Sequence, residues 1–135
     1  MAKVTGLGWS AFTVADSGGT PRAILNDFTD VKFATPRAVQ DVTGIDKSAI
    51  ERLLLLADFS CTINGVFDPA ANAAHDVFKT VPSISVARAT TITTNGKTLA
   101  VNVLYTDYPV TRAAGGELTY SVPGVLADGA VPTWA

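Results

Sequence analysis

The chain alternates apolar and polar residues in several short segments, which is the pattern of strands that bury one face. Residues 9–15 place Phe12 and Val14 between small or polar neighbours and end at a turn sequence, residues 16–19. Residues 57–67 alternate in the same way. Their apolar set is Phe59, Cys61, Ile63 and Phe67, and their polar set is Ser60, Thr62 and Asn64. Both segments therefore predict strands that are buried on one side.

A second group of alternating segments surrounds the dipeptide Asn95-Gly96. This residue pair readily adopts the positive φ angles of a tight hairpin turn, so we predict a hairpin between residues 83–93 and residues 97–110. After a turn at residues 113–116, residues 117–125 alternate again. The apolar residues of the two later strands are Leu99, Val101, Val103 and Tyr105, then Leu118, Tyr120 and Val122; the polar residues of the last strand are Glu117, Thr119 and Ser121.

Residues 24–43 favour extended structure, but Pro36 interrupts them. Residues 28–35 and 38–43 are β-favouring, and proline removes a backbone donor from a β-ladder, so these segments are predicted to be edge strands or a long exposed arm. Residues 48–51 fit a helix capping box, and residues 49–57 contain good helix formers. Local propensity alone therefore favours a helix there.

The apolar period changes from two to about 3.6 residues after position 68. Asp68 can cap a helix and Pro69 suits its first turn, while the apolar residues that follow recur at helical spacing. These apolar residues are Ala70, Ala73, Ala74, Val77 and Phe78. The spacing predicts a short helix over residues 69–80, stopped by Pro82. The predicted fold is mainly β: an antiparallel sandwich or barrel with one short helix, in a single domain spanning residues 1–135.

The composition adds that this domain has few charges with which to cover its surface. Hydrophobic residues make up 47% of the chain and charged residues 16%. Such a chain buries enough apolar area to fold, and the shortage of charge indicates surface that is buried against neighbours. The formal net charge is −2, and lysine and arginine are scattered, so tight binding to a nucleic-acid backbone is not expected.

Cys61 is the only cysteine, which excludes an internal disulfide and fits synthesis in a reducing cytoplasm. Because Cys61 belongs to an apolar face, we expect a buried, inert thiol. Residues 1–8 lack the apolar region of a secretory signal, and the aliphatic run at residues 53–56 is too short to span a bilayer. The chain is therefore predicted to be soluble and not exported.

No set of residues in the sequence predicts catalysis or metal binding. His75 is the only histidine, and no paired metal-ligand spacing or nucleophile motif accompanies it. We expect it at a polar position on the exposed flank of the short helix. The sequence predicts no cofactor, and the glycine pairs at residues 18–19 and 115–116 are interpreted as turns. Four carboxylates could form an acid/base pair, but caps, turns and strand ends explain their positions equally well. They are Asp58, Asp68, Asp76 and Asp107.

Five aromatic residues could line a ligand groove or anchor core and subunit contacts, and we favour contacts. They are Trp9, Tyr105, Tyr108, Tyr120 and Trp134.

Nearly the whole chain resembles the tail tube proteins of long-tailed bacteriophages, especially those of actinobacterial hosts. Residues 41–44 read Asp-Val-Thr-Gly, and residues 51–53 and 56–68 follow the family's pattern R-L-x-x-L-x-D-x-S-x-T-x-x-G-x-F-D. Residues 72–79 are similar to the short helix that follows this strand in the family, and residues 127–134 resemble its D-G-x-x-x-x-W ending. The chain departs from the pattern at Leu54-Leu55, where glycine or proline is common.

The resemblance implies a structural virion protein of the tail, assembled in the host cytoplasm, with six subunits in each ring and rings stacked into a conduit for DNA ejection. Its implied partners are copies of itself, a tape measure protein and tail terminator or tip proteins, with transient passage of DNA and no membrane. Residues 35–56 would form the inter-subunit arm, which favours loop or extended structure over a helix at residues 49–57. The arm residues expected to make contacts are Thr35, Pro36, Arg37, Val42, Thr43, Ile50, Arg52 and Leu53.

Polar strand faces could line the water-filled lumen of such a tube. The candidate lumen residues are Ser60, Thr62, Asn64, Glu117, Thr119 and Ser121. Three alternative functions remain from the sequence: a tail terminator, a capsid decoration protein, and a monomeric carbohydrate-binding β-sandwich that would use exposed aromatic residues. An enzyme is the class with least support.

Overall fold

The computed structural model of the chain describes residues 3–135, almost all of them in strands and the turns that join them. One nine-stranded antiparallel sheet and one two-stranded sheet account for every strand in this range. The strands are β1 (Trp9–Ala15), β2 (Pro21–Ala23), β3 (Phe28–Ala34), β4 (Arg37–Asp41), β5 (Arg52–Ala57), β6 (Ser60–Val66), β7 (Arg88–Thr94), β8 (Lys97–Tyr105), β9 (Val110–Arg112), β10 (Leu118–Leu126) and β11 (Thr133–Trp134). The helical elements are α1 (Ala74–Phe78) and the 3₁₀ turns η1 (Gly6–Gly8) and η2 (Leu25–Asp27).

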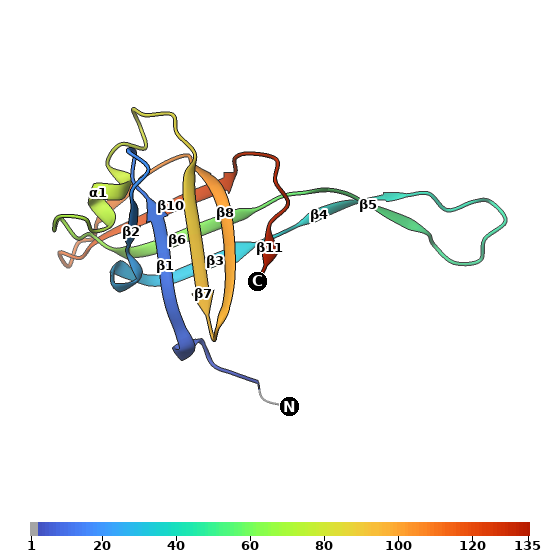
Figure 1. Cartoon of the computed structure of the whole chain (residues 1–135), viewed down its shortest axis with the longest axis horizontal. Helices are drawn as coiled ribbons and strands as arrows, with labels where there is room; N and C mark the ends of the chain where they lie inside the picture. The colour runs from blue at the N-terminus through green and yellow to red at the C-terminus, as the bar shows by residue number, and fades with distance from the viewer. Residues whose placement is uncertain (1–2) are drawn as a thin grey trace.

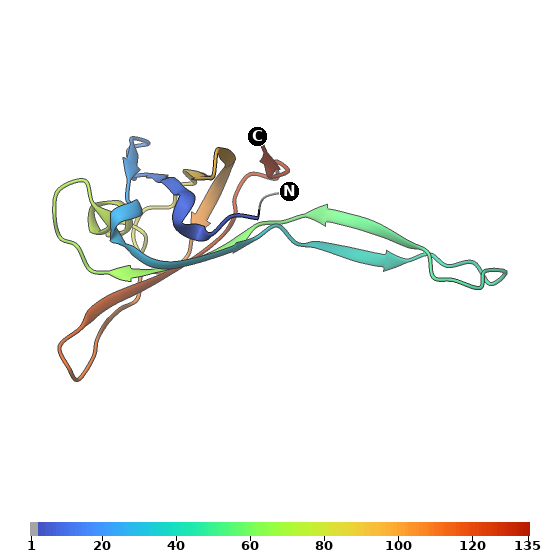
Figure 2. The same cartoon turned by 90° about the horizontal axis from the view of Figure 1, so that it is seen from below.

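The large sheet folds over between β8 and β10, so that it covers itself in two layers. Its order is β2-β1-β7-β8-β10-β6-β3, with β9 added beside β10 and β11 beside β8. Strands β1, β7 and β8 cross β3, β6 and β10 at a steep angle, and the two groups lie on opposite sides of the interior (Figures 1 and 2). The predicted antiparallel sandwich with one short helix and a long hairpin arm is confirmed.

The core lies between the two layers and includes most of the residues that alternation assigned to it, although Leu118 is 39% exposed and Phe67 is only half-buried. Phe12 and Val14 of β1 and Ile63 of β6 belong to this core, and all three are at most 1% exposed. The apolar face predicted for β8 is also buried, at Leu99, Val101, Val103 and Tyr105. Helix α1 closes one end of the sandwich with Ala74, Val77 and Phe78, which are fully buried.

The hairpin predicted around Asn95-Gly96 is confirmed, although its strands cover residues 88–94 and 97–105 and are shorter overall than the predicted 83–93 and 97–110. Asn95 has φ 52° and Gly96 has φ 80°, and Thr94 pairs with Lys97 at the end of the β7–β8 ladder. Both turn residues therefore occupy the left-handed region that asparagine and glycine tolerate best.

The helix predicted over residues 69–80 is shorter than the periodicity indicated, because α1 begins at Ala74 and ends at Phe78. Asp68 Oδ1 accepts a hydrogen bond from the Ala70 amide (3.0 Å), which makes a turn, and Asn72 then adopts φ 63°. The first turn of α1 is instead stabilised from a distant segment, since Asp27 Oδ2 accepts from the Ala74 amide at 2.9 Å. Local capping signals cannot reveal such a long-range acceptor.

The alternative helix at residues 49–57 is wrong, and residues 52–57 form β5. The capping box at residues 48–51 is not made, because the Glu51 amide donates to Thr43 Oγ1 across the hairpin at 2.8 Å. The strand predicted over residues 57–67 is also divided, with β5 ending at Ala57 and β6 beginning at Ser60. Loop or extended structure over residues 35–56, as the family resemblance implied, is what the chain adopts, with β4 and β5 flanking a loop over residues 42–51.

Candidate assembly surfaces

The arm is a β-hairpin that extends away from the sandwich. Strands β4 and β5 pair with each other and, within residues 3–135, with no other strand. The hairpin leaves the body as a continuation of β3 and β6 and carries the long loop 42–51 at its tip (Figures 1 and 2). Pro36 lies between β3 and β4, where a missing amide donor ends one ladder and allows the next to begin.

Hydrogen bonds within the hairpin fix its register. Val39 lies opposite Leu54, Gln40 opposite Leu53 and Asp41 opposite Arg52. At the tip, Asp41 Oδ1 accepts from the amide of Thr43 (2.9 Å) and from its hydroxyl (2.6 Å), and these hydrogen bonds lower the pKa of Asp41.

At the base of the hairpin, Arg37 Nε donates to the Leu55 carbonyl at 2.9 Å. The ion pair of Lys47 with Glu51 (3.7 Å) joins two exposed side chains, and such pairs contribute little to stability.

The arm exposes apolar side chains that a folded monomer ordinarily buries. Leu53, Leu54, Leu55 and Leu56 are 55%, 59%, 41% and 90% exposed. Exposed large apolar residues continue along β4 and the loop at Val39, Val42, Ile45 and Ile50. An isolated two-stranded hairpin is marginally stable in water, and a contiguous apolar surface of this kind marks an interaction site.

The predicted arm residues all lie in or next to this hairpin. Arg37 belongs to β4 and Arg52 and Leu53 to β5, while Thr35 and Pro36 link β3 to β4. Val42, Thr43 and Ile50 lie in the loop at the tip. The structure therefore groups the predicted residues on one projection, and contact with a second subunit remains a prediction.

The predicted lumen residues gather on the outer face of the layer formed by β3, β6 and β10, with one exception. Asn64 lies opposite Ser121 on β10 and opposite Asp30 on β3, and its Nδ2 donates to Asp30 Oδ2 at 3.3 Å. Ser60, Thr62 and Thr119 continue the same face of β6 and β10. Glu117 precedes β10, in the exposed turn that joins β9 to β10.

His75 is not on the exposed flank of the helix, as the sequence predicted, but is half-buried beside Tyr108 and Phe67. Its Nδ1 lies 3.2 Å from Tyr108 Oη, and its ring centre is 4.8 Å from that of Phe67. Tyr108 follows β8 and is brought to the helix by the fold, which a helical pattern cannot show. Burial raises the pKa of Tyr108 to about 12, so it stays a neutral hydrogen-bonding group.

A buried carboxylate, Asp27, lies beneath α1 and was not singled out from the sequence. It is 8% exposed, and its backbone carbonyl accepts from Tyr120 Oη at 3.3 Å. Burial, with the neighbouring Asp68 carboxylate, raises the pKa of Asp27. Its position at the end of the 3₁₀ turn η2, far from α1 in sequence, explains why sequence patterns missed it.

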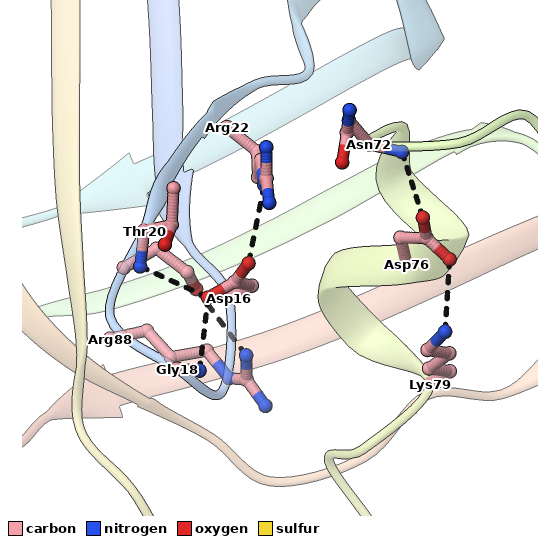
Figure 3. Close-up of polar contacts among 9 residues, drawn as sticks. Asp16, Gly18, Thr20, Arg22, Asn72, Asp76, Lys79 and Arg88 are labelled. Atoms are coloured by element: carbon pink, nitrogen blue, oxygen red, sulfur yellow. Dashed lines mark hydrogen bonds and ion pairs between the residues drawn. The ribbon is translucent and has the colours of Figure 1, made fainter.

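The remaining carboxylates serve turns, as one of the two interpretations predicted. Asp16 Oδ1 accepts from the amides of Gly18 and Thr20 at 2.9 and 3.0 Å, and Asp76 accepts from the Asn72 amide and Lys79 Nζ (Figure 3).

Asp58 and Asp107 each accept from the amide of the next residue, at 2.7 and 2.8 Å. Near the Asp16 turn, the buried Arg88 (Figure 3) donates to the Ala15 carbonyl at 3.3 Å and to Thr80 Oγ1 at 2.8 Å.

The candidate chemical groups are structural in this arrangement. Cys61 is 5% exposed, and burial raises the pKa of its thiol to about 12, as an inert core thiol requires. Tyr105 and Tyr120 are buried in the core, whereas Trp134 is half exposed. Residues 3–135 hold no group of three potential metal ligands. None of the helices in this range has the length and apolar character needed to cross a membrane.

Two solved structures share this fold over nearly the full length of the chain. One is the tail of an empty gene transfer agent particle, obtained by helical refinement with C6 symmetry; the match covers 98% of this chain and 99% of that chain, with TM-score 0.72 and 16% identity. The chain has the fold of a gene transfer agent tail protein. The other, the virion of a native gene transfer agent particle, matches with TM-score 0.71, 15% identity and coverage of 98% and 99%.

The tail fold agrees with the resemblance to tail tube proteins that the sequence motifs indicated. No protein-family profile matches the sequence, and no curated protein matches it.

Proposed function

We propose that this chain is a structural tail subunit whose copies close into six-membered rings and stack into a hollow tube that conducts DNA. The observation that carries the proposal is the projecting hairpin, whose four consecutive leucines remain at least 41% exposed when residues 3–135 are folded. An exposed apolar projection of this kind promotes aggregation of a monomer, whereas in a polymer it can be buried against neighbouring subunits. The likeness to a chain from a C6-symmetric tail supports six copies per ring.

Ring closure is supported by the edges of the large sheet. Strands β2 and β3 are the end strands of its main path, and among residues 3–135 no further strand pairs with the outer edge of either one. Heterologous contacts that repeat by rotation close into rings, and a second contact along the axis stacks the rings. In this arrangement the sheet edges provide the contact around the ring and the arm provides the contact between rings.

The polar face of β3, β6 and β10 is the surface that we assign to the lumen. It carries Ser60, Thr62, Asn64, Thr119 and Ser121, which bind water and offer DNA no cationic row to adhere to. Glu117 would lie near the rim of this surface. If Glu117→Lys left DNA passage and infectivity unchanged, a lumen role for Glu117 would be refuted.

The proposed role is structural and involves no catalysis or cofactor. The protein would reside in the tail of the particle after assembly in the host cytoplasm. It would contact a tape measure protein inside the tube and terminator or tip proteins at its ends. These partners follow from the proposal that the chain forms a tube, and they would be excluded if that proposal were wrong.

The experiment that tests the tube is negative-stain electron microscopy of the purified protein, paired with light scattering over a concentration series. Rings or hollow tubes of uniform width are the expected result. A monodisperse monomer at every concentration, with glycan binding, would replace the tube by the carbohydrate-binding module. Assembly into closed single rings that never stack would favour a tail terminator.

A further inference from the structure

Both faces of the arm carry exposed leucines, and this determines how the arm can be covered. Side chains alternate along β5, so Leu53 and Leu55 point to one face and Leu54 and Leu56 to the other. Val39, which lies opposite Leu54, adds to the second face. All of these side chains are more than 40% exposed.

A hairpin that rests on the surface of a neighbour does not have this pattern. Such a hairpin has one apolar face and one polar face, as β6 does in the body, where Cys61 and Ile63 are buried and Ser60 faces outward. β5 instead resembles strands that are covered on both sides, which have continuous apolar runs. Both faces of β5 therefore need to be covered by other protein surface.

We propose that the arm of one subunit is inserted between two other copies of this chain, with each apolar face packed against a different copy. The inference rests on the proposed tube and specifies its contact between rings. One arm would thereby join three subunits, and six arms would lock each ring to the next at the junctions between neighbouring subunits.

The chemistry of the arm favours a second copy over nucleic acid or a membrane. Its charges are balanced, with Arg37, Lys47 and Arg52 against three carboxylates: Asp41, Asp46 and Glu51. This balance offers no basic surface to a phosphate backbone. The leucines lie next to the body, whereas the distal loop holds Asp46 and Lys47, so insertion into lipid would have to carry the charged tip first.

The body of the chain carries apolar surface that can receive the arm. Val131 and Trp134 near the carboxyl end are 65% and 50% exposed. Apolar surface of this kind next to uncharged strands is typical of the buried centre of a protein interface.

The test compares paired variants that remove the apolar side chains from one face at a time. Leu53→Ser with Leu55→Ser changes one face, Leu54→Ser with Leu56→Ser changes the other, and Leu7→Ser removes an exposed leucine outside the arm. We expect both paired variants to raise the critical concentration for assembly at least about tenfold, and Leu7→Ser to leave it unchanged. Loss of assembly with only one of the paired variants would overturn the inference, because the other face would then be free.

A polarity-sensitive dye separates this inference from the tube itself. Cysteines introduced at positions 54 and 55 are labelled singly, since buried Cys61 is poorly reactive. On assembly of the labelled protein with excess unlabelled protein, a blue shift at both positions supports insertion. Tubes in which only one dye shifts overturn the inserted arm and leave the tube standing. If the unlabelled chain never assembles, both dyes remain in water and both proposals fail. A shift produced by phosphatidylcholine vesicles alone overturns the second copy as the occupant.

Discussion

Strands β5 and β6 are separated by only two residues, yet they differ in how far their apolar side chains are buried. In β6 the buried residues alternate with polar ones, and Ile63 is fully buried inside the sandwich. In β5 four leucines follow one another, and each is at least 41% exposed. Alternation of apolar and polar residues thus indicates a strand with one face buried inside its own chain. An uninterrupted apolar run on a projecting strand instead indicates a strand that another molecule buries.

The largest expected effect tests the first half of this comparison. Ile63→Ala removes a fully buried side chain between β10 and β3, so it should lower the free energy of unfolding by about 2–5 kcal/mol through lost transfer energy and the cavity left behind. Urea denaturation followed by tryptophan fluorescence measures the change. A loss below about 1 kcal/mol would mean that the body is as loosely packed at this position as the arm, and the contrast would fail.

A second prediction concerns a close contact in the body, at Gly65. A Cβ added at Gly65 would meet the Asp27 carbonyl and the ring of Tyr120, so Gly65→Ala should destabilise the fold by about 1–3 kcal/mol through overpacking. The same measurement on Gly44→Ala in the arm loop serves as a control, because an added Cβ there meets only side-chain atoms of exposed residues. Equal losses at both glycines would show that packing at Gly65 is not limiting.

Most of the body could be predicted from local patterns, because its strands use alternation and its main hairpin uses Asn95-Gly96. What could not be predicted depended on contacts distant in sequence. The start of α1 is set by Asp27, 47 positions away from Ala74, and the burial of His75 is set by Tyr108. For the arm, helix propensity and β-pairing competed over residues 49–57, and cross-hairpin bonds such as that of Glu51 with Thr43 decided in favour of the strand.

The third prediction uses pH to test the contact between the body and its helix. Burial raises the folded-state pKa of Asp27 above its ordinary value of 3.8, so the folded state favours the protonated acid. Its contribution to stability is present below pH 3.8 and is lost as pH rises through the folded-state pKa. Asp27→Asn stays neutral while keeping an oxygen for the Ala74 amide, so it should gain stability relative to the unchanged protein as pH rises.

Unfolding free energies across about pH 3 to 7 measure this difference. Asp68 faces Asp27 and has the opposite dependence, since its pKa is lowered by the Ala70 amide and by Asp27. Tyr108 and Tyr120 also face the site and remain neutral across this range. A difference between variant and unchanged protein that is constant with pH would exclude Asp27 as the titrating group.

The smallest expected effect on folding is the most informative for the arm. Leu55→Ala makes a truncation of the same size as Ile63→Ala, but its side chain is 41% exposed on a hairpin outside the core, so the monomer should change by no more than about 0.5 kcal/mol. Its cost should instead appear in assembly, as a higher critical concentration in light scattering. If Leu55→Ala destabilised the monomer as much as Ile63→Ala does, the arm would fold back onto the body in solution, and its leucines would not be reserved for other subunits. If the stability of the monomer is unchanged and assembly is weakened, another copy of the chain is what buries the leucines of β5.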